Sequence, residues 1–265
     1  MATLNKHLET FGINRFTSSD TYFDWGGRIL GQDVAETLNN LREPLVEDRA
    51  TDQERLAFYD FTMQSNIAGV VLSLKADAIR ASGEAVAGRL EGATRILDIG
   101  CSCGYLTLWY AYLLPAAAVI GIDVSLTSVR TAKMYANEMQ IKNAVFVGGD
   151  PRKALNGERF DAIVDTQSVL ETSDRRPLLK WIAGALNDHG KFISVPQTGT
   201  RNIFKQYCEE IEHAGLVITA ITPVPFSDLG EKGAYPLITA EAAHAASATT
   251  VDRDHLFDEL LELVN

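Results

Sequence analysis

A short segment with glycines near both ends follows an apolar run in the middle of the chain. It reads Asp98-Ile-Gly-Cys-Ser-Cys-Gly104 and comes directly after Ile96 and Leu97. Gly100 and Gly104 permit a sharp turn from strand to helix, and without a Cβ atom they let a ligand approach the backbone closely. The free N–H groups at the start of the next helix favour polar or anionic ligand groups. The segment therefore predicts a nucleotide-type site at the carboxyl end of a strand.

Four aspartates follow or end apolar runs in chain order, namely Asp98, Asp123, Asp150 and Asp165. Asp123 comes 25 residues after Asp98, near the spacing at which a carboxylate binds ribose hydroxyls in dinucleotide-binding folds. The carboxyl ends of parallel strands meet at one edge of a sheet, so all four would line one crevice. A glycine turn alone is weak evidence, whereas this ordered set predicts cofactor binding.

The elements that must position these residues alternate between apolar strands and helices. The predicted strands cover residues 95–99, 119–124, 144–147, 160–165, 190–195, 216–224 and 235–239, with helices over 125–140, 174–186 and 203–213. This alternation is typical of a parallel sheet covered on both faces. Residues 225–233 are too few for a crossover helix, so the last two strands should pair antiparallel. We predict a doubly wound, mostly parallel seven-stranded α/β fold with an antiparallel last strand.

The first 92 residues differ from the rest, because residues 33–42 and 52–90 have helical composition. We predict an N-terminal helical lobe over residues 1–92 and an α/β domain over 93–265, ending in a helix after residue 250. The aromatic residues Tyr22, Phe23 and Trp25 precede the helical stretches. They would either close over a cofactor or flat substrate, or form a hydrophobic staple inside the lobe, and the sequence leaves both alternatives open.

The charge balance argues against a nucleic-acid partner. The 265 residues contain 24 Lys and Arg against 35 Asp and Glu, a formal net charge of -11. Such a surface repels phosphate backbones unless a basic stripe is present. The nearest candidates, 152–153 and 175–176, are doublets with acidic residues nearby. Nucleic acid is therefore disfavoured.

A membrane or metal role also finds little support in the sequence. Residues 99–122 form a run of 24 residues without a formal charge, but Pro115 leaves only about ten apolar residues for a helix, too few to span a bilayer. The cysteines Cys101, Cys103 and Cys208 form neither a disulfide framework nor a zinc motif. With no apolar signal-peptide core at the N-terminus, we expect a cytoplasmic protein without a membrane span or a bound metal.

These motifs resemble the class I S-adenosylmethionine-dependent methyltransferases over roughly residues 95–239. The family's first motif, Asp/Glu-x-Gly-x-Gly-x-Gly, is matched by residues 98–104, with Ser102 at the central glycine. The resemblance implies that S-adenosyl-L-methionine is the cofactor and that Gly100, Ser102 and Gly104 pack against its methionine portion, with Asp98 anchoring the loop. It further implies the ribose at Asp123, the adenine at Val124, Gly149, Asp150 and Pro151, and the cofactor's amino acid and the substrate at Asp165, Thr166 and Gln167.

The same comparison narrows the methyl acceptor. Residues 165–168, Asp-Thr-Gln-Ser, lack the Pro-Pro of amino-group methyltransferases, and the chain contains no Pro-Cys dipeptide of the kind that cytosine-C5 enzymes use. Together with the negative charge, this favours a small molecule with an O, N or C nucleophile. The region after residue 166 is similar to small-molecule O-methyltransferases with an N-terminal helical lobe. Glu171 is the candidate base there, provided that burial raises its pKa.

Several alternatives stay open at this point. The chain could instead be a protein or peptide methyltransferase, or a non-catalytic cofactor-binding protein of the same fold. An NAD-dependent dehydrogenase shares the sheet and the glycine turn. The N-terminal lobe is also a candidate surface for a homodimer.

Overall fold

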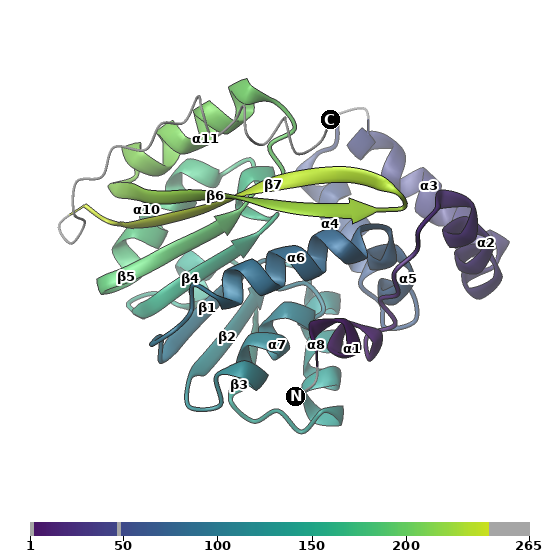
Figure 1. Cartoon of the computed structure of the whole chain (residues 1–265), viewed down its shortest axis with the longest axis horizontal. Helices are drawn as coiled ribbons and strands as arrows, with labels where there is room; N and C mark the ends of the chain where they lie inside the picture. The colour runs from purple at the N-terminus through teal and green to yellow at the C-terminus, as the bar shows by residue number, and fades with distance from the viewer. Residues whose placement is uncertain (1–2, 47–48, 244–265) are drawn as a thin grey trace.

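The computed structural model describes residues 3–46 and 49–243 of the 265 in the chain. Within them, seven strands form one sheet in the order β3-β2-β1-β4-β5-β7-β6 (Figure 1). The strands are β1 (Arg95–Ile99), β2 (Ala118–Asp123), β3 (Ala144–Gly148), β4 (Phe160–Thr166), β5 (Leu186–Val195), β6 (Leu216–Asp228) and β7 (Glu231–Ala242). Neighbours among β1 to β5 run parallel, whereas β7 pairs antiparallel with both β5 and β6. The predicted fold class is confirmed.

Both faces of the sheet are covered by helices, which explains why its strands are apolar almost throughout. Ile96 packs in the core shared with α6 (Ala76–Ala87), α7 (Tyr105–Leu113) and α8 (Leu126–Glu138). Its neighbour Leu97 packs in the opposite core, shared with α10 (Arg175–Ala185) and α11 (Arg201–His213). Successive strand residues point to opposite faces, so a strand buried on both sides needs apolar residues at every position.

The remaining helices belong to the N-terminal part of the chain. They are α1 (Leu4–Glu9), α2 (Ser19–Leu30), α3 (Gln32–Val46), α4 (Asp52–Thr62) and α5 (Ala68–Leu72), followed by the 3-10 helix η1 (Ser73–Lys75). Helices α2 to α5 gather at one end of the sheet, on the right in Figure 1. Helix α4 begins with a capping box in which Thr51 and Glu54 bind each other's backbone N–H, which fixes its first turn.

The predicted division at residue 92 does not separate two cores. Leu4 and Leu8 on α1 pack in the same apolar cluster as Leu106 and Trp109 on α7. Helix α6 lies against β6 and β7 as well as against α7. The two-domain division stays a prediction, and the packing across it is continuous for α1 and α6.

The predicted loop over residues 225–233 is wrong. Strands β6 and β7 continue into this region and pair as far as Asp228 and Glu231, which leaves a two-residue turn. Pro225 is tolerated within β6 because β6 is the edge strand of the sheet. The tip is held by reciprocal bonds, since Asp228 accepts from the backbone N–H of Asp77 and Asp77 accepts from that of Ser227.

The long uncharged run divides as the sequence predicts, into a loop, a buried helix and a strand. Helix α7 takes nine of its residues and β2 begins at Ala118. Among the described residues, no helix combines the length and the hydropathy that crossing a membrane requires. The predicted helix after residue 250 lies outside the described residues.

Candidate functional site

The loop between β1 and α7 depends on backbone conformations that favour glycine. Gly100, Ser102 and Gly104 have φ angles of 69°, 53° and 83°. A Cβ on Gly100 would lie 2.3 Å from the Cβ of Ser168, and one on Gly104 would lie 2.8 Å from the Phe146 ring. The two glycines are therefore required by neighbouring side chains, a reason that the sequence prediction of close ligand approach did not contain.

Asp123 ends β2 beside this loop. Its Oδ2 accepts from the backbone N–H of Ser102 at 2.9 Å, and its Oδ1 accepts from that of Ser125 at 2.8 Å. Burial raises the pKa of the Asp123 carboxyl, the two N–H donors oppose this, and the nearby Asp60 charge raises it further. Each carboxylate oxygen can accept a second hydrogen bond. Asp123 is thus held in place and still able to bind further donors.

Apolar side chains and open space flank Asp123 on one side. Val124 is 59% exposed and Leu126 is 61% exposed. Gly149, whose N–H donates to the Asp123 carbonyl at 2.9 Å, has a φ of 119° and nothing within 4 Å of the place where a Cβ would be. Exposed apolar side chains beside an open backbone segment suit a flat ring. This is where the sequence predicts the adenine.

Asp150 lies at the same end of the sheet but already has a charged partner. It caps α9 (Pro151–Ala154), whose first residue Pro151 is buried, and it accepts from both the backbone and the guanidinium of Arg152. The Arg152 bonds keep the pKa of the Asp150 carboxyl below its usual value. Arg152 also binds Asp174 at 2.5 Å. A role for Asp150 toward the adenine amino group stays a prediction, and the ion pair would compete with it.

Asp165 at the end of β4 is buried and surrounded by protein donors. Five donor atoms lie within hydrogen-bond distance of its two oxygens: the N–H groups of Ser168 and Val169 and the hydroxyls of Ser168, Ser194 and Tyr207. The side chain is 0% exposed. This saturation favours a scaffold role, in which Asp165 fixes the turn after β4, over the predicted direct contact with the cofactor.

Asp98 is buried as well, but its one recorded side-chain partner is Thr107 on α7, whose hydroxyl donates at 2.5 Å. Burial raises the pKa of the Asp98 carboxyl to about 7, and the negative charges of Asp165 and Asp123 contribute. The predicted anchoring role fits this contact, which ties β1 to the helix beyond the loop.

Helix α4 crosses the carboxyl edge of the sheet, where the crevice is predicted, and contacts residues that follow β2 and residues that follow β4. Toward β4, the Tyr59 hydroxyl donates to Glu171 Oε2 at 2.6 Å. Toward β2, the Ser125 hydroxyl donates to Asp60 Oδ1 at 2.5 Å. Just after the helix, Met63 accepts through its carbonyl from Thr131. Sequence reasoning missed these contacts, because an aromatic run such as residues 58–61 looks the same whether it is core or lid.

Polar side chains from several elements lie near the ends of β4 and β5. Glu171, in the 3-10 helix η2 (Val169–Glu171), is exposed and therefore lacks the burial on which its predicted role as a base depends. Burial and the Glu171 charge raise the pKa of the Tyr59 hydroxyl far above its ordinary value, so it remains a donor. Lys75 donates to Gln197 Oε1 at 2.8 Å, just beyond β5. Thr166 and Gln167, the latter with a φ of 63°, are partly buried at the end of β4.

Comparison with known proteins identifies the family. The sequence model of a family described as a methyltransferase domain matches residues 90–242, more than half of the chain. The chain belongs to this methyltransferase family. The predicted class, a class I S-adenosylmethionine-dependent methyltransferase, is confirmed, and with it S-adenosylmethionine as the methyl donor.

Individual relatives match only part of this methyltransferase. A ubiquinone biosynthesis O-methyltransferase from Rhodopseudomonas palustris (strain TIE-1) is 34% identical over 117 residues, which is 43% of this chain and 42% of that enzyme. Among solved structures, an O-methyltransferase of a polyketide multienzyme from Brevibacillus brevis, in complex with S-adenosyl-L-homocysteine, has a TM-score of 0.55 and 15% identity over 72% of this chain and 80% of its own. A methyltransferase from Aquifex aeolicus has a TM-score of 0.52 and 15% identity, over 62% and 93%. These structural likenesses show the fold.

The residues around Asp123 in this methyltransferase fit the family's cofactor. Asp123 offers acceptors that suit a ribose diol, and the exposed Val124 and Leu126 with the open Gly149 suit an adenine ring. The loop serine at the family's central glycine keeps the left-handed conformation, and its N–H is directed at Asp123. Residue assignments at this site remain proposals.

The aromatic residues of α2 lie inside the N-terminal part. The Tyr22 hydroxyl donates to the Val70 carbonyl at 3.1 Å, and its ring contacts Phe16, Phe23 and Trp25. Phe23 is 62% exposed. These contacts match the hydrophobic-staple alternative, and a role of Tyr22, Phe23 and Trp25 toward a ligand stays a prediction.

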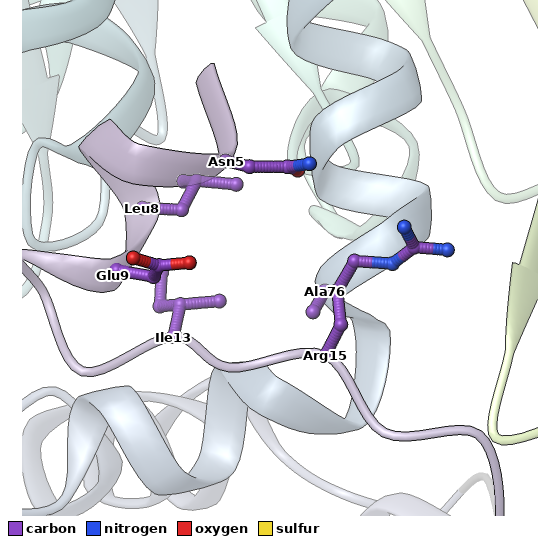
Figure 2. Close-up of a pocket in the computed structure, with 6 residues that line it drawn as sticks. All are labelled: Asn5, Leu8, Glu9, Ile13, Arg15 and Ala76. Carbon is purple, nitrogen blue, oxygen red and sulfur yellow. The ribbon is translucent and has the colours of Figure 1, made fainter. Parts of the chain in front are cut away.

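Figure 2 shows a separate hollow far smaller than a nucleotide, between α1 and the start of α6. Its volume is about 70 Å³ and it is lined by Asn5, Leu8, Glu9, Ile13, Arg15 and Ala76. This is room for a couple of water molecules. Within the described part of the chain, no group of three or more His, Cys, Asp or Glu residues is placed to hold a metal ion.

Proposed function

We propose that this methyltransferase transfers the methyl group to a hydroxyl oxygen of a small molecule. The observation that carries the proposal is the position of α4 across the predicted crevice, with the 100–104 loop and Asp123 at the ends of β1 and β2 and Glu171 just after β4. One end suits the cofactor and the other offers a carboxylate to an acceptor proton. The similarity to O-methyltransferases supports the choice of oxygen.

The chain's own residues would mainly position the reactants and remove a proton. When bound, the cofactor supplies an activated methyl group, so orientation and exclusion of water can provide most of the acceleration. Asp123 would hold the ribose, and α4 would cover the crevice from solvent. This division of labour needs one further group, a base for the acceptor hydroxyl.

Glu171 is suited to that task by how its two oxygens are used. Oε2 accepts from Tyr59, which fixes the orientation of the carboxylate. On Oε1, no donor is recorded among the described residues. Oε1 can therefore accept the acceptor proton while the Tyr59 bond keeps the group in place. The tyrosine itself is no base, because its raised pKa keeps it protonated.

Transfer of labelled methyl tests the acceptor class. The purified chain is incubated with methyl-labelled S-adenosylmethionine and a cell extract, which is then separated by size. We expect the label in the low-mass fraction. Label confined to macromolecules would instead support a protein or peptide acceptor, and cofactor binding without any transfer would support a non-catalytic role.

Glu171→Gln tests the base. With an acceptor taken from the labelled fraction, we expect kcat to fall by about 10²–10⁴-fold, the range for loss of a general base. Affinity for S-adenosyl-L-homocysteine should not change, because Glu171 lies at the acceptor end. Glu209→Gln, an exposed glutamate on α11, is the matched control. An unchanged kcat in Glu171→Gln would remove Glu171 from the chemistry.

The predicted cytoplasmic location and the homodimer through the N-terminal lobe stay predictions.

A further inference from the structure

Two adjacent residues of α4 reach opposite sides of the crevice. Tyr59 contacts Glu171 beyond β4, and Asp60 contacts Ser125 beyond β2. The family's cofactor occupies the carboxyl edge of the sheet between these two strand ends. Helix α4 therefore lies across the cofactor site rather than beside it, and its side chains are candidates for direct contact with the cofactor.

Ser125 connects Asp60 to the carboxylate of β2. The Ser125 N–H donates to Asp123 Oδ1 at 2.8 Å, while its hydroxyl donates to Asp60 Oδ1 at 2.5 Å. Ser125 is 0% exposed, so this connection is shielded from solvent. Two carboxylates, one from each part of the chain, thus share one serine.

The carboxylates of Asp60 and Asp123 carry like charges and repel each other, and the Asp60 charge accordingly raises the pKa of the Asp123 carboxyl. A molecule that brings two hydroxyl donors would relieve the repulsion. Asp60 has an oxygen for such a donor, because no partner is recorded on its Oδ2 among the described residues. The vicinal hydroxyls of a ribose are donors of this kind.

We propose that Asp60 is a second ribose-binding carboxylate, carried by α4, which completes the cofactor site that Asp123 begins. This inference rests on the proposed function. Cofactor binding would then favour the seated position of α4, and the same position places Tyr59 on Glu171. The ribose would thereby help to order the proposed base, which lies at the other end of the crevice.

The test measures binding, by calorimetry, of S-adenosyl-L-homocysteine and of its 2′-deoxy and 3′-deoxy analogues. We expect Asp60→Ala to bind S-adenosyl-L-homocysteine about tenfold more weakly than the unchanged chain, as for loss of a hydrogen bond to a charged group. One of the deoxy analogues should bind equally to both, since the hydroxyl that Asp60 would bind is missing from it. Asp60→Asn keeps an acceptor for Ser125 and should show a smaller loss of the same selectivity.

Two further variants separate ribose contact from mere seating of α4. Asp52→Ala removes a different α4 contact, in which the Ser173 hydroxyl donates to Asp52 at 2.7 Å, and Ser125→Ala removes the shared serine hydroxyl. Equal weakening of all three ligands in Asp60→Ala, or no weakening, would overturn the inference. If the unchanged chain binds no S-adenosyl-L-homocysteine, the proposed function fails instead, so the two failures are distinguishable.

Discussion

The ends of β2 and β4 both carry an aspartate, offset by one residue in the sheet register, and the two side chains have different surroundings. Asp165 has five donor atoms around its carboxylate and no exposed surface. Asp123 has two recorded donors, both backbone N–H groups, and faces Asp60 across Ser125. Protein donors fill the acceptor positions of the Asp165 carboxylate, whereas the Asp123 carboxylate can accept further hydrogen bonds. We therefore expect a strand-end aspartate to bind a ligand or to serve only the fold according to how many protein donors it has.

The comparison predicts that isosteric changes at the two ends will affect different properties. Asp165→Asn should lower the free energy of unfolding by about 3–5 kcal/mol, because an amide group would face buried donors that lose their acceptor. Urea denaturation measures this loss. Any loss of cofactor affinity should follow the loss of folded protein.

A different result at Asp165 would break the comparison. If Asp165→Asn keeps its stability and loses affinity for S-adenosyl-L-homocysteine, then Asp165 contacts the cofactor as the sequence predicts, and its donors are not saturating. Asp24→Asn, at an exposed position on α2, controls for the change of charge.

Much of the fold could be predicted from the sequence, because local patterns determine it. The apolar strands, the Ser125 cap of α8 and the glycine turn are all properties of neighbouring residues. The prediction failed at the β6–β7 tip, where a loop was expected over residues 225–233 and the two strands pair instead. There the decisive contacts come from Asp77, about 150 residues away in the chain, and no local pattern encodes them.

The candidate site divides in the same way. Its sheet side could be predicted, because strand ends in a parallel sheet converge whatever surrounds them. Its α4 side could not, because Tyr59 and Glu171 are 112 residues apart and Asp60 and Ser125 are 65 apart. The donor count at Asp165 was hidden for the same reason, since Ser194 and Tyr207 come from β5 and α11.

Asp98 on β1 is a third strand aspartate. It is buried like Asp165, but among the described residues its one side-chain donor is Thr107. Its pKa is raised from 3.8 to about 7, so the folded state holds the proton more tightly than the unfolded chain. Between these two values stability falls as pH rises, and the penalty is complete above about pH 7. Asp98→Asn, neutral at every pH, should then be more stable than the unchanged chain at pH 8, by about 2–4 kcal/mol.

Urea denaturation of both proteins at pH 4 and pH 8 checks this expectation. Near pH 4 the two stabilities should be close, because Asp98 is then protonated in the folded state and largely protonated in the unfolded chain. Equal pH dependence in the two proteins would contradict the raised pKa of Asp98. It would indicate that its carboxylate has hydrogen-bond donors in addition to Thr107.

Asp123→Asn provides the smallest expected effect and the most specific one. We expect affinity for S-adenosyl-L-homocysteine to fall by about 1–3 kcal/mol, since hydrogen bonds from the ribose to a charged group become bonds to a neutral one. Stability should change less than in Asp165→Asn, because an amide oxygen still accepts from one of the two backbone donors. Calorimetric titration beside urea denaturation gives both quantities. Unchanged affinity would place Asp123 with Asp165 among the scaffold residues, and free acceptor capacity would then no longer mark the ligand-binding end of the sheet.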